Sequence, residues 1–156
     1  MTEAVQKPYQ NRPGAIGISV RRLRFNPKAI RRHYFANSPL LSHFFTALSS
    51  TFPVGEQFFV HSVRNVRAQV QDEQLQAQIA AFIGQEAMHS KAHAEFNAAW
   101  RRGDYNLDRF QTWLARKDRY VKSLPPEIQL AITCAFEHFT ALLGGLVMGL
   151  GAHLNR

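Results

Sequence analysis

The chain has 156 residues, of which 46% are hydrophobic and 12 are Phe, so it is long and apolar enough for one domain with a packed core. Its one cysteine, Cys134, excludes an internal disulfide and favours a reducing, cytoplasmic setting, and the polar start of the chain lacks a signal-peptide pattern. The net charge of +8 leaves nucleic acid, an anionic membrane surface and an anionic substrate as partner classes.

The first part of the chain divides into a tail and a basic segment. Residues 1–15 are rich in Gln, Pro and Gly and predict a flexible tail ahead of a helical domain over residues 16–156. In residues 16–32 apolar side chains interleave with basic ones, which predicts a short extended segment. Without a recognised nucleic-acid motif, a solvated surface segment is the preferred interpretation, nucleic acid is disfavoured, and a membrane surface is a weak alternative. The basic residues are Arg21, Arg22, Arg24, Lys28, Arg31 and Arg32.

The rest of the chain has helical periodicity and no alternating strand pattern, which predicts an all-α helical bundle. An apolar run predicts a short helix over residues 39–50, and Pro53 and Gly55 are expected to interrupt it. The further predicted helices cover residues 54–71, 72–100 and 107–124, and a last helix begins at the Pro125-Pro126 pair.

The helix predicted over residues 72–100 carries ionisable residues on its apolar stripe. The ends of the stripe are apolar and its middle is ionisable, so we expect Glu86, His89 and His93 to point inward. In steps of three and four residues, the stripe consists of Leu75, Ile79, Phe82, Glu86, His89, His93, Phe96 and Trp100.

Two other predicted helices each place one carboxylate, Glu56 or Glu137, on an apolar stripe. Buried carboxylates must protonate, pair or bind a metal, and these stripes contain no Lys or Arg. We therefore expect a divalent metal bound by Glu56, Glu86, His89 and Glu137, a donor set that suits iron, manganese or zinc. Glu86 and His89 also have the Glu-x-x-His spacing of ferritin-like two-metal bundles.

Several residues keep a second interpretation. Glu56 taken alone is more often a structural polar group than a ligand. His93 lies one turn beyond His89 and is either a further metal ligand or a group that orients Glu86 or Glu137. Cys134, one turn before Glu137, is expected to be a small buried hydrophobic residue.

At these residues the chain resembles a bacterial family of predicted metal-dependent hydrolases, which is similar to the ferritin-like di-iron carboxylate proteins. The resemblance implies that Glu56, Glu86, His89 and Glu137 are metal ligands. Family members are longer and carry a further ligand-bearing helix. The resemblance therefore also implies that residues 16–156 are the N-terminal part of a longer family domain and that the bundle is incomplete at its C-terminus. A homodimer is one possible source of the missing helix. The matching segments are Pro53–Phe59, Phe82–His93, Ala135–Ala141 and Val20–Phe25.

Three functions remain open from the sequence. The first is a metal-dependent hydrolase with Glu56 or Glu137 as catalytic base and an unidentified small-molecule substrate. The second is a di-iron oxygenase or oxidase in which Glu86 and Glu137 bridge two irons; iron is the expected metal, with manganese and zinc as alternatives. The third is a non-catalytic helical binding protein with a basic N-terminal segment.

Overall fold

A computed structural model describes residues 17–22, 31–101 and 107–154 of the chain. The described residues form four helices and no strand, which confirms the all-α prediction. The tail predicted over residues 1–15, and Arg24 and Lys28 of the basic segment, lie outside the described residues. The helices are α1 (Pro39–Arg67), α2 (Glu73–Arg101), α3 (Asp108–Lys122) and α4 (Pro126–Leu154).

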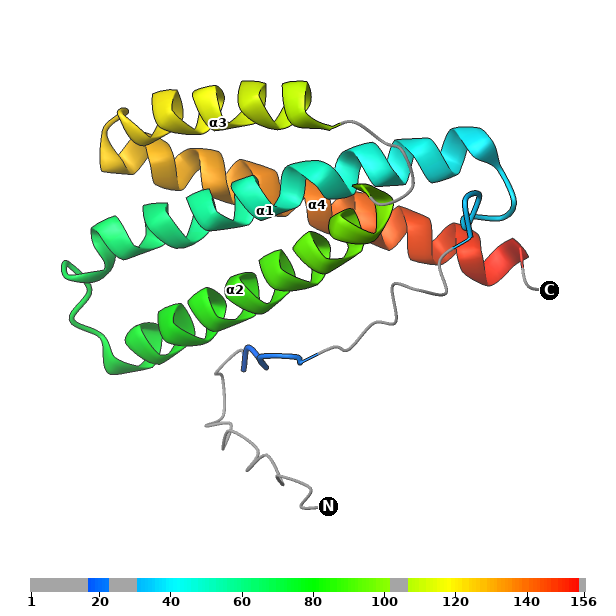
Figure 1. The fold of residues 1–156 in the computed structure, drawn as a ribbon. Helices are drawn as coiled ribbons and strands as arrows, with labels where there is room; N and C mark the ends of the chain where they lie inside the picture. The colour runs from blue at the N-terminus through cyan, green and yellow to red at the C-terminus, as the bar shows by residue number, and fades with distance from the viewer. Residues whose placement is uncertain (1–16, 23–30, 102–106, 155–156) are drawn as a thin grey trace, which may run out of the picture.

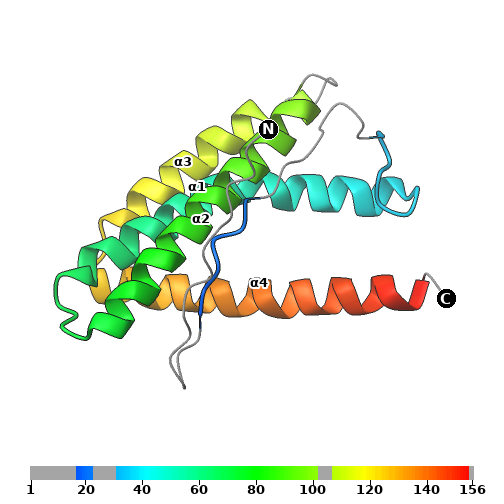
Figure 2. The same ribbon diagram turned by 90° about the horizontal axis from the view of Figure 1, so that it is seen from below.

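Helix α1 is the centre of the arrangement, because it contacts each of the other three helices. Helix α2 lies alongside α1 and makes the most extensive of these contacts (Figure 1). Helix α4 packs on α1 with its first half, and its C-terminal half runs away from α2 and α3 (Figure 2). The interior of the described part of the chain therefore lies between α1 and the helices that pack on it.

The helix ends follow the local signals in the sequence. Ser38 caps α1 by accepting a hydrogen bond from the Leu41 N–H at 3.3 Å, and Pro39 occupies the first turn, where its missing N–H is not needed. Asp72 accepts a hydrogen bond from the Leu75 N–H at 2.6 Å at the start of α2. The predicted starts at residues 39, 72 and 125–126 are therefore confirmed to within a residue or two.

The prediction that Pro53 and Gly55 interrupt the first helix is wrong, since α1 continues through both residues. Pro53 has no N–H to donate to the carbonyl of Ser49, one turn earlier. The side-chain amide of Asn97 on α2 replaces it, donating to that carbonyl at 3.0 Å. The Ser90 hydroxyl also donates to the carbonyl of Pro53 at 3.3 Å. The neighbouring helix thus supplies the hydrogen bond that the proline removes.

The buried face of α1 is largely polar, with small hydroxyl side chains along it. Ser42, Thr46, Ser49 and Ser62 are all buried, whereas Phe58 and Phe59 are the buried apolar residues of this helix. The hydroxyls of Thr46 and Ser62 bond to carbonyls of their own helix, and the Ser49 hydroxyl bonds to Asn97 of α2, where its short side chain allows the helices to approach closely. The α1–α2 contact therefore depends on close polar packing as well as on apolar burial.

Helix α4 is much less buried than its apolar stripe predicts. Cys134 is exposed, which corrects the expectation of a buried residue, and Glu137 is half-buried. By length and composition alone, Pro126–Val147 could cross a membrane, and few of its residues are buried. The reason for the difference is that, among the described helices, α1 alone makes extensive contacts with this helix. The large apolar side chains left exposed on α4 are Ile128, Phe136, Phe139, Leu142 and Leu146.

The contact between Asn97 and Ser49 gives a prediction about stability. Asn97→Leu should lower the free energy of unfolding by about 2 kcal/mol, because the Ser49 carbonyl loses its donor in a buried setting. In a Pro53→Ala background the cost should be clearly smaller, since the substituted alanine has an N–H that can donate to the same carbonyl. Urea unfolding of the two single variants and the double variant measures both values. Equal costs in the two backgrounds would contradict the explanation.

Candidate metal centre

The most buried ionisable side chain at the site is Glu56, near the middle of α1. Its residue exposure is 1%, and Nδ1 of His89 lies 2.8 Å from its Oε1. This contact is short enough for an ion pair, and beyond it no described residue donates a hydrogen bond to either Glu56 oxygen. A buried carboxylate with unfilled acceptors is costly by itself and suits a bound cation.

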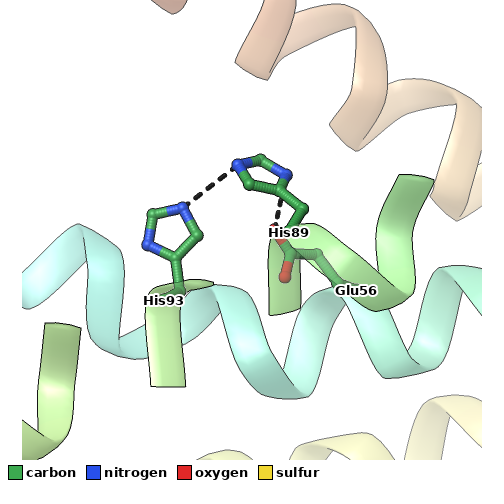
Figure 3. A group of neighbouring side chains, drawn as sticks. All are labelled: Glu56, His89 and His93. Atoms are coloured by element: carbon green, nitrogen blue, oxygen red, sulfur yellow. Dashed lines mark hydrogen bonds and ion pairs between the residues drawn. The ribbon is translucent and has the colours of Figure 1, made fainter. Parts of the chain in front are cut away.

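His89 and His93 of α2 lie next to this carboxylate, as Figure 3 shows. Their Nε2 atoms are 3.2 Å apart, and one ligand atom from each histidine and from Glu56 lies within 4.8 Å of the others. Phe52 of α1 packs against both imidazole rings, with centroid distances of 5.8 Å to His89 and 4.4 Å to His93. One carboxylate and two imidazoles form a donor set typical of divalent transition metals.

A chain of hydrogen bonds fixes which nitrogen of His93 carries the proton. The Asn97 amide nitrogen must face the Ser49 carbonyl, so its oxygen faces the Ser49 hydroxyl and accepts from it at 2.9 Å. The hydroxyl proton is thereby used, and His93 Nδ1, 2.8 Å from the Ser49 oxygen, must be the donor in that contact. The lone pair of neutral His93 is therefore on Nε2, which faces His89.

The two facing Nε2 atoms need a proton or a cation between them. Because His93 Nε2 has no proton, His89 Nε2 must donate in the metal-free protein, with His89 Nδ1 directed at Glu56. The pKa values of the two histidines are consistent with this placement of the protons. The Glu56 carboxylate is the main cause that raises the pKa of His89. Burial, followed by the charge of His89, lowers the pKa of His93 to about 4. A metal ion bound by both nitrogens would replace that proton.

Helix α4 brings Glu137 to the same region through a ladder of contacts with α1. Asn65 pairs with Gln129, and Ser62 pairs with Thr133, at 3.2 Å and 2.6 Å between the bonded atoms. The ring of Phe59 lies 6.2 Å from that of Phe136. The helices run in opposite directions along this ladder, so its next step places Glu56 near Glu137. Burial raises the pKa of Glu137, His89 lowers it, and Glu56 raises it further, as expected for neighbours.

Glu86 of α2 is a second buried carboxylate beside the group of three. It lines, together with Glu56, a hollow of about 510 Å³ that also reaches Arg64 and Lys122. Burial, and then the negative charges of Glu137 and Glu56, raise the pKa of Glu86 to about 7. Glu86 therefore changes its charge near neutral pH, which suits a group that takes up or releases a proton.

The structure thus brings Glu56, His89 and His93 into one group of ligand atoms. Glu86 and Glu137 interact with this group electrostatically, but they do not belong to the set of ligand atoms that lie within 4.8 Å of one another. His89 lies against the buried Glu56, but 47% of its side chain is exposed. The reason is that its ring lies beside a cavity that opens to solvent.

Two residues of the site, Ser49 and Asn97, were not found from the sequence. A signal was available, because Ser49 lies seven residues before Glu56 and Asn97 four residues after His93, on the same helical faces as those residues. Apolar and ionisable residues define the predicted stripes, and neutral polar side chains such as these do not stand out from solvated positions in the sequence. Their importance depends on the hydrogen bonds that the two helices make together.

Comparison with known proteins identifies a family for this chain. The model of a family described as predicted metal-dependent hydrolase matches residues 19–155, which is most of the chain and includes every candidate ligand. No curated protein and no solved structure matches the chain.

The hydrogen-bond chain predicts the tautomer of His93. In metal-free protein, long-range ¹H–¹⁵N spectra should show the His93 proton on Nδ1 and an unprotonated Nε2. Ser49→Ala should allow the other tautomer, because Nδ1 loses its acceptor. Ser50→Ala is the matched control, since Ser50 is also buried on α1 but bonds to the carbonyl of Ala47 in its own helix. A His93 proton on Nε2 in the unaltered protein would refute the assignment.

The raised pKa of Glu86 predicts a pH-dependent effect on stability. The folded state holds the Glu86 proton up to a pKa of about 7, above the ordinary value of 4.5, so this carboxyl favours folding at low pH and loses that contribution as pH rises through 7. In metal-free protein, Glu86→Gln should therefore increase the free energy of unfolding at pH 8 by about 2 kcal/mol, and the gain should vanish below pH 4.5.

Urea unfolding with a chelator at about pH 4.5 and about pH 8 measures this difference. Glu95→Gln is the control, because Glu95 is an exposed carboxylate on the same helix, 3.9 Å from Lys91 Nζ. A gain for Glu86→Gln that is equal at the two pH values would show that the effect does not come from ionisation.

Proposed function

Because this chain belongs to the family of predicted metal-dependent hydrolases, we propose that it hydrolyses a small-molecule substrate with a divalent metal ion held by Glu56, His89 and His93. The observation that carries the proposal is the buried Glu56 carboxylate, which has no hydrogen bond from a described residue and lies against the His89–His93 pair. Its unfilled acceptors and the lone pair on His93 Nε2 fit a cation.

The residues around this group would have distinct tasks. Ser49 and Asn97 hold His93 with its Nε2 lone pair directed at the site, and Phe52 packs against both imidazole rings. A bound divalent ion supplies a Lewis acid that makes water more acidic and polarises a carbonyl or phosphoryl oxygen. Iron is the metal we expect first, with manganese and zinc as alternatives.

We assign the role of general base to Glu86, with Glu137 as the neighbouring carboxylate. Glu86 has a pKa of about 7 and lines a hollow beside Glu56, so it can accept a proton from water at neutral pH. Glu56, which the sequence also suggested as a base, is less suited because it is completely buried against His89. Glu137 raises the pKa of Glu86 through its charge.

A second candidate is an oxygen-activating two-metal centre, favoured by the electrostatic interaction among Glu56, Glu86 and Glu137. In this alternative, Glu86 and Glu137 would bind a second metal ion, whose positive charge would neutralise them, as in ferritin-like di-iron proteins. The two candidates differ in the number of metal ions and in their need for oxygen.

The proposal predicts metal binding with release of a proton. Protein purified without a His tag should bind one divalent ion, and calorimetry in buffers of different ionisation enthalpy should show the release of the His89 proton. Glu56→Gln should weaken binding at least about tenfold. Glu95→Gln, on the exposed face of α2, should leave it unchanged.

Activity and stoichiometry then separate the two candidates. With p-nitrophenyl acetate and p-nitrophenyl phosphate as probes, a hydrolase should act equally in air and without oxygen, and Glu86→Gln should abolish turnover while one metal ion stays bound. A fall from two bound ions to one in Glu86→Gln would favour the two-metal candidate. Metal binding that is the same in wild type and Glu56→Gln would refute the site.

A further inference from the structure

A cavity of about 240 Å³ adjoins the two histidines and shares no lining residue with the hollow beside Glu56 and Glu86. One face of α2 lines most of it, because the lining positions recur about one helical turn apart, at residue 85, residues 88 and 89, residues 92 and 93, and residue 96. Ser49 of α1 and Arg21 of the N-terminal segment complete the lining. The α2 residues, in order along the helix, are Gln85, Met88, His89, Ala92, His93 and Phe96.

Arg21 is brought to this cavity by two contacts between residues 17–22 and α2. The Arg21 N–H donates to the Gln85 side-chain oxygen at 3.0 Å. Val20 packs on Gly84 so closely that a Cβ at Gly84 would come within 3.0 Å of Val20 Cγ2. The absence of a side chain at Gly84 therefore lets the segment lie on the helix, with Arg21 next to Gln85 and one helical turn from His89.

The lining has a distinct charge pattern along its length. Arg21 is the only permanently charged residue among the described residues that line the cavity, and no carboxylate lines it. Ala92, between the two histidines, and Phe96, beyond them, are apolar. A guanidinium is suited to carboxylate and phosphate groups, whereas the far end suits a hydrocarbon or aromatic group.

We infer that this cavity is the substrate site and that it takes an organic anion, with a carboxylate or phosphate at Arg21, the reacting bond beside His89 and His93, and an apolar body towards Phe96. This inference rests on the proposed function for the reacting bond alone. The preference for an anion depends on Arg21 and on the contacts at Gly84 and Gln85.

The hollow beside Glu56 and Glu86 is less suited to the same ligand. Its two carboxylates repel an anion, and the ammonium group of Lys122 is already 2.7 Å from Asp118. Its remaining cation, Arg64, provides a matched control, because this arginine lies near the site but lines only the other hollow.

The test compares phenylacetate with its neutral amide, phenylacetamide, by calorimetry or by saturation-transfer NMR on metal-free and zinc-loaded protein. Metal-free wild type should bind phenylacetate roughly fivefold more tightly than the amide, since Arg21 is exposed and its attraction is partly screened. Arg21→Gln should remove this preference, and Arg64→Gln should keep it.

A second variant tests the position of Arg21 without changing its charge. Gly84→Leu should displace residues 17–22 through the contact with Val20 and reduce the preference as Arg21→Gln does, while circular dichroism shows that the helices persist. An undiminished preference in Arg21→Gln, or no binding of phenylacetate at millimolar concentration, would overturn the inference. An anion preference in a protein that neither binds metal nor hydrolyses esters would refute the proposed function and leave this inference standing.

Discussion

The burial of Glu56 is the constraint on which the site depends. A carboxylate at 1% exposure, with no hydrogen bond from a described residue, must share its charge with something nearby. In the metal-free protein that partner is His89, which in turn needs an acceptor at its other nitrogen. The acceptor is His93, held by Ser49 and Asn97. The buried charge of Glu56 thus explains why His89, His93, and then Ser49 and Asn97 follow one another as hydrogen-bonding or ion-pair partners between α1 and α2.

Much of the fold and part of the site follow from the sequence. Helical periodicity and the Pro125-Pro126 pair predict the helices, since these signals act locally. The stripes likewise single out Glu56 and His89. The continuous path of α1 could not be predicted, because the hydrogen bond that compensates for the proline comes from another helix. The exposure of α4 could not be predicted either, because apolar periodicity does not say what covers a helix face.

The position of α1 explains how three separate helices contribute to one site. Ser49 and Glu56 on this helix contact α2, and Phe59, Ser62 and Asn65 contact α4. The charges of Glu56, Glu86 and Glu137 therefore act on one another although they are far apart in the sequence. The clustering of carboxylates and imidazoles at one place is consistent with the membership of this chain in a family of predicted metal-dependent hydrolases.

The small hydroxyl residue Ser49 on the inner face of α1 has a consequence for evolution. Because Ser49 lies between α1 and α2, where its hydroxyl contacts His93 and Asn97, a larger side chain there would separate the two helices and move His89 away from Glu56. Substitutions tolerated there during divergence should therefore be limited to Ala, Gly, Ser, Thr or Cys, whichever substrate a lineage adopts. The spacing of two helices, and not only the identity of the ligands, would then be under purifying selection.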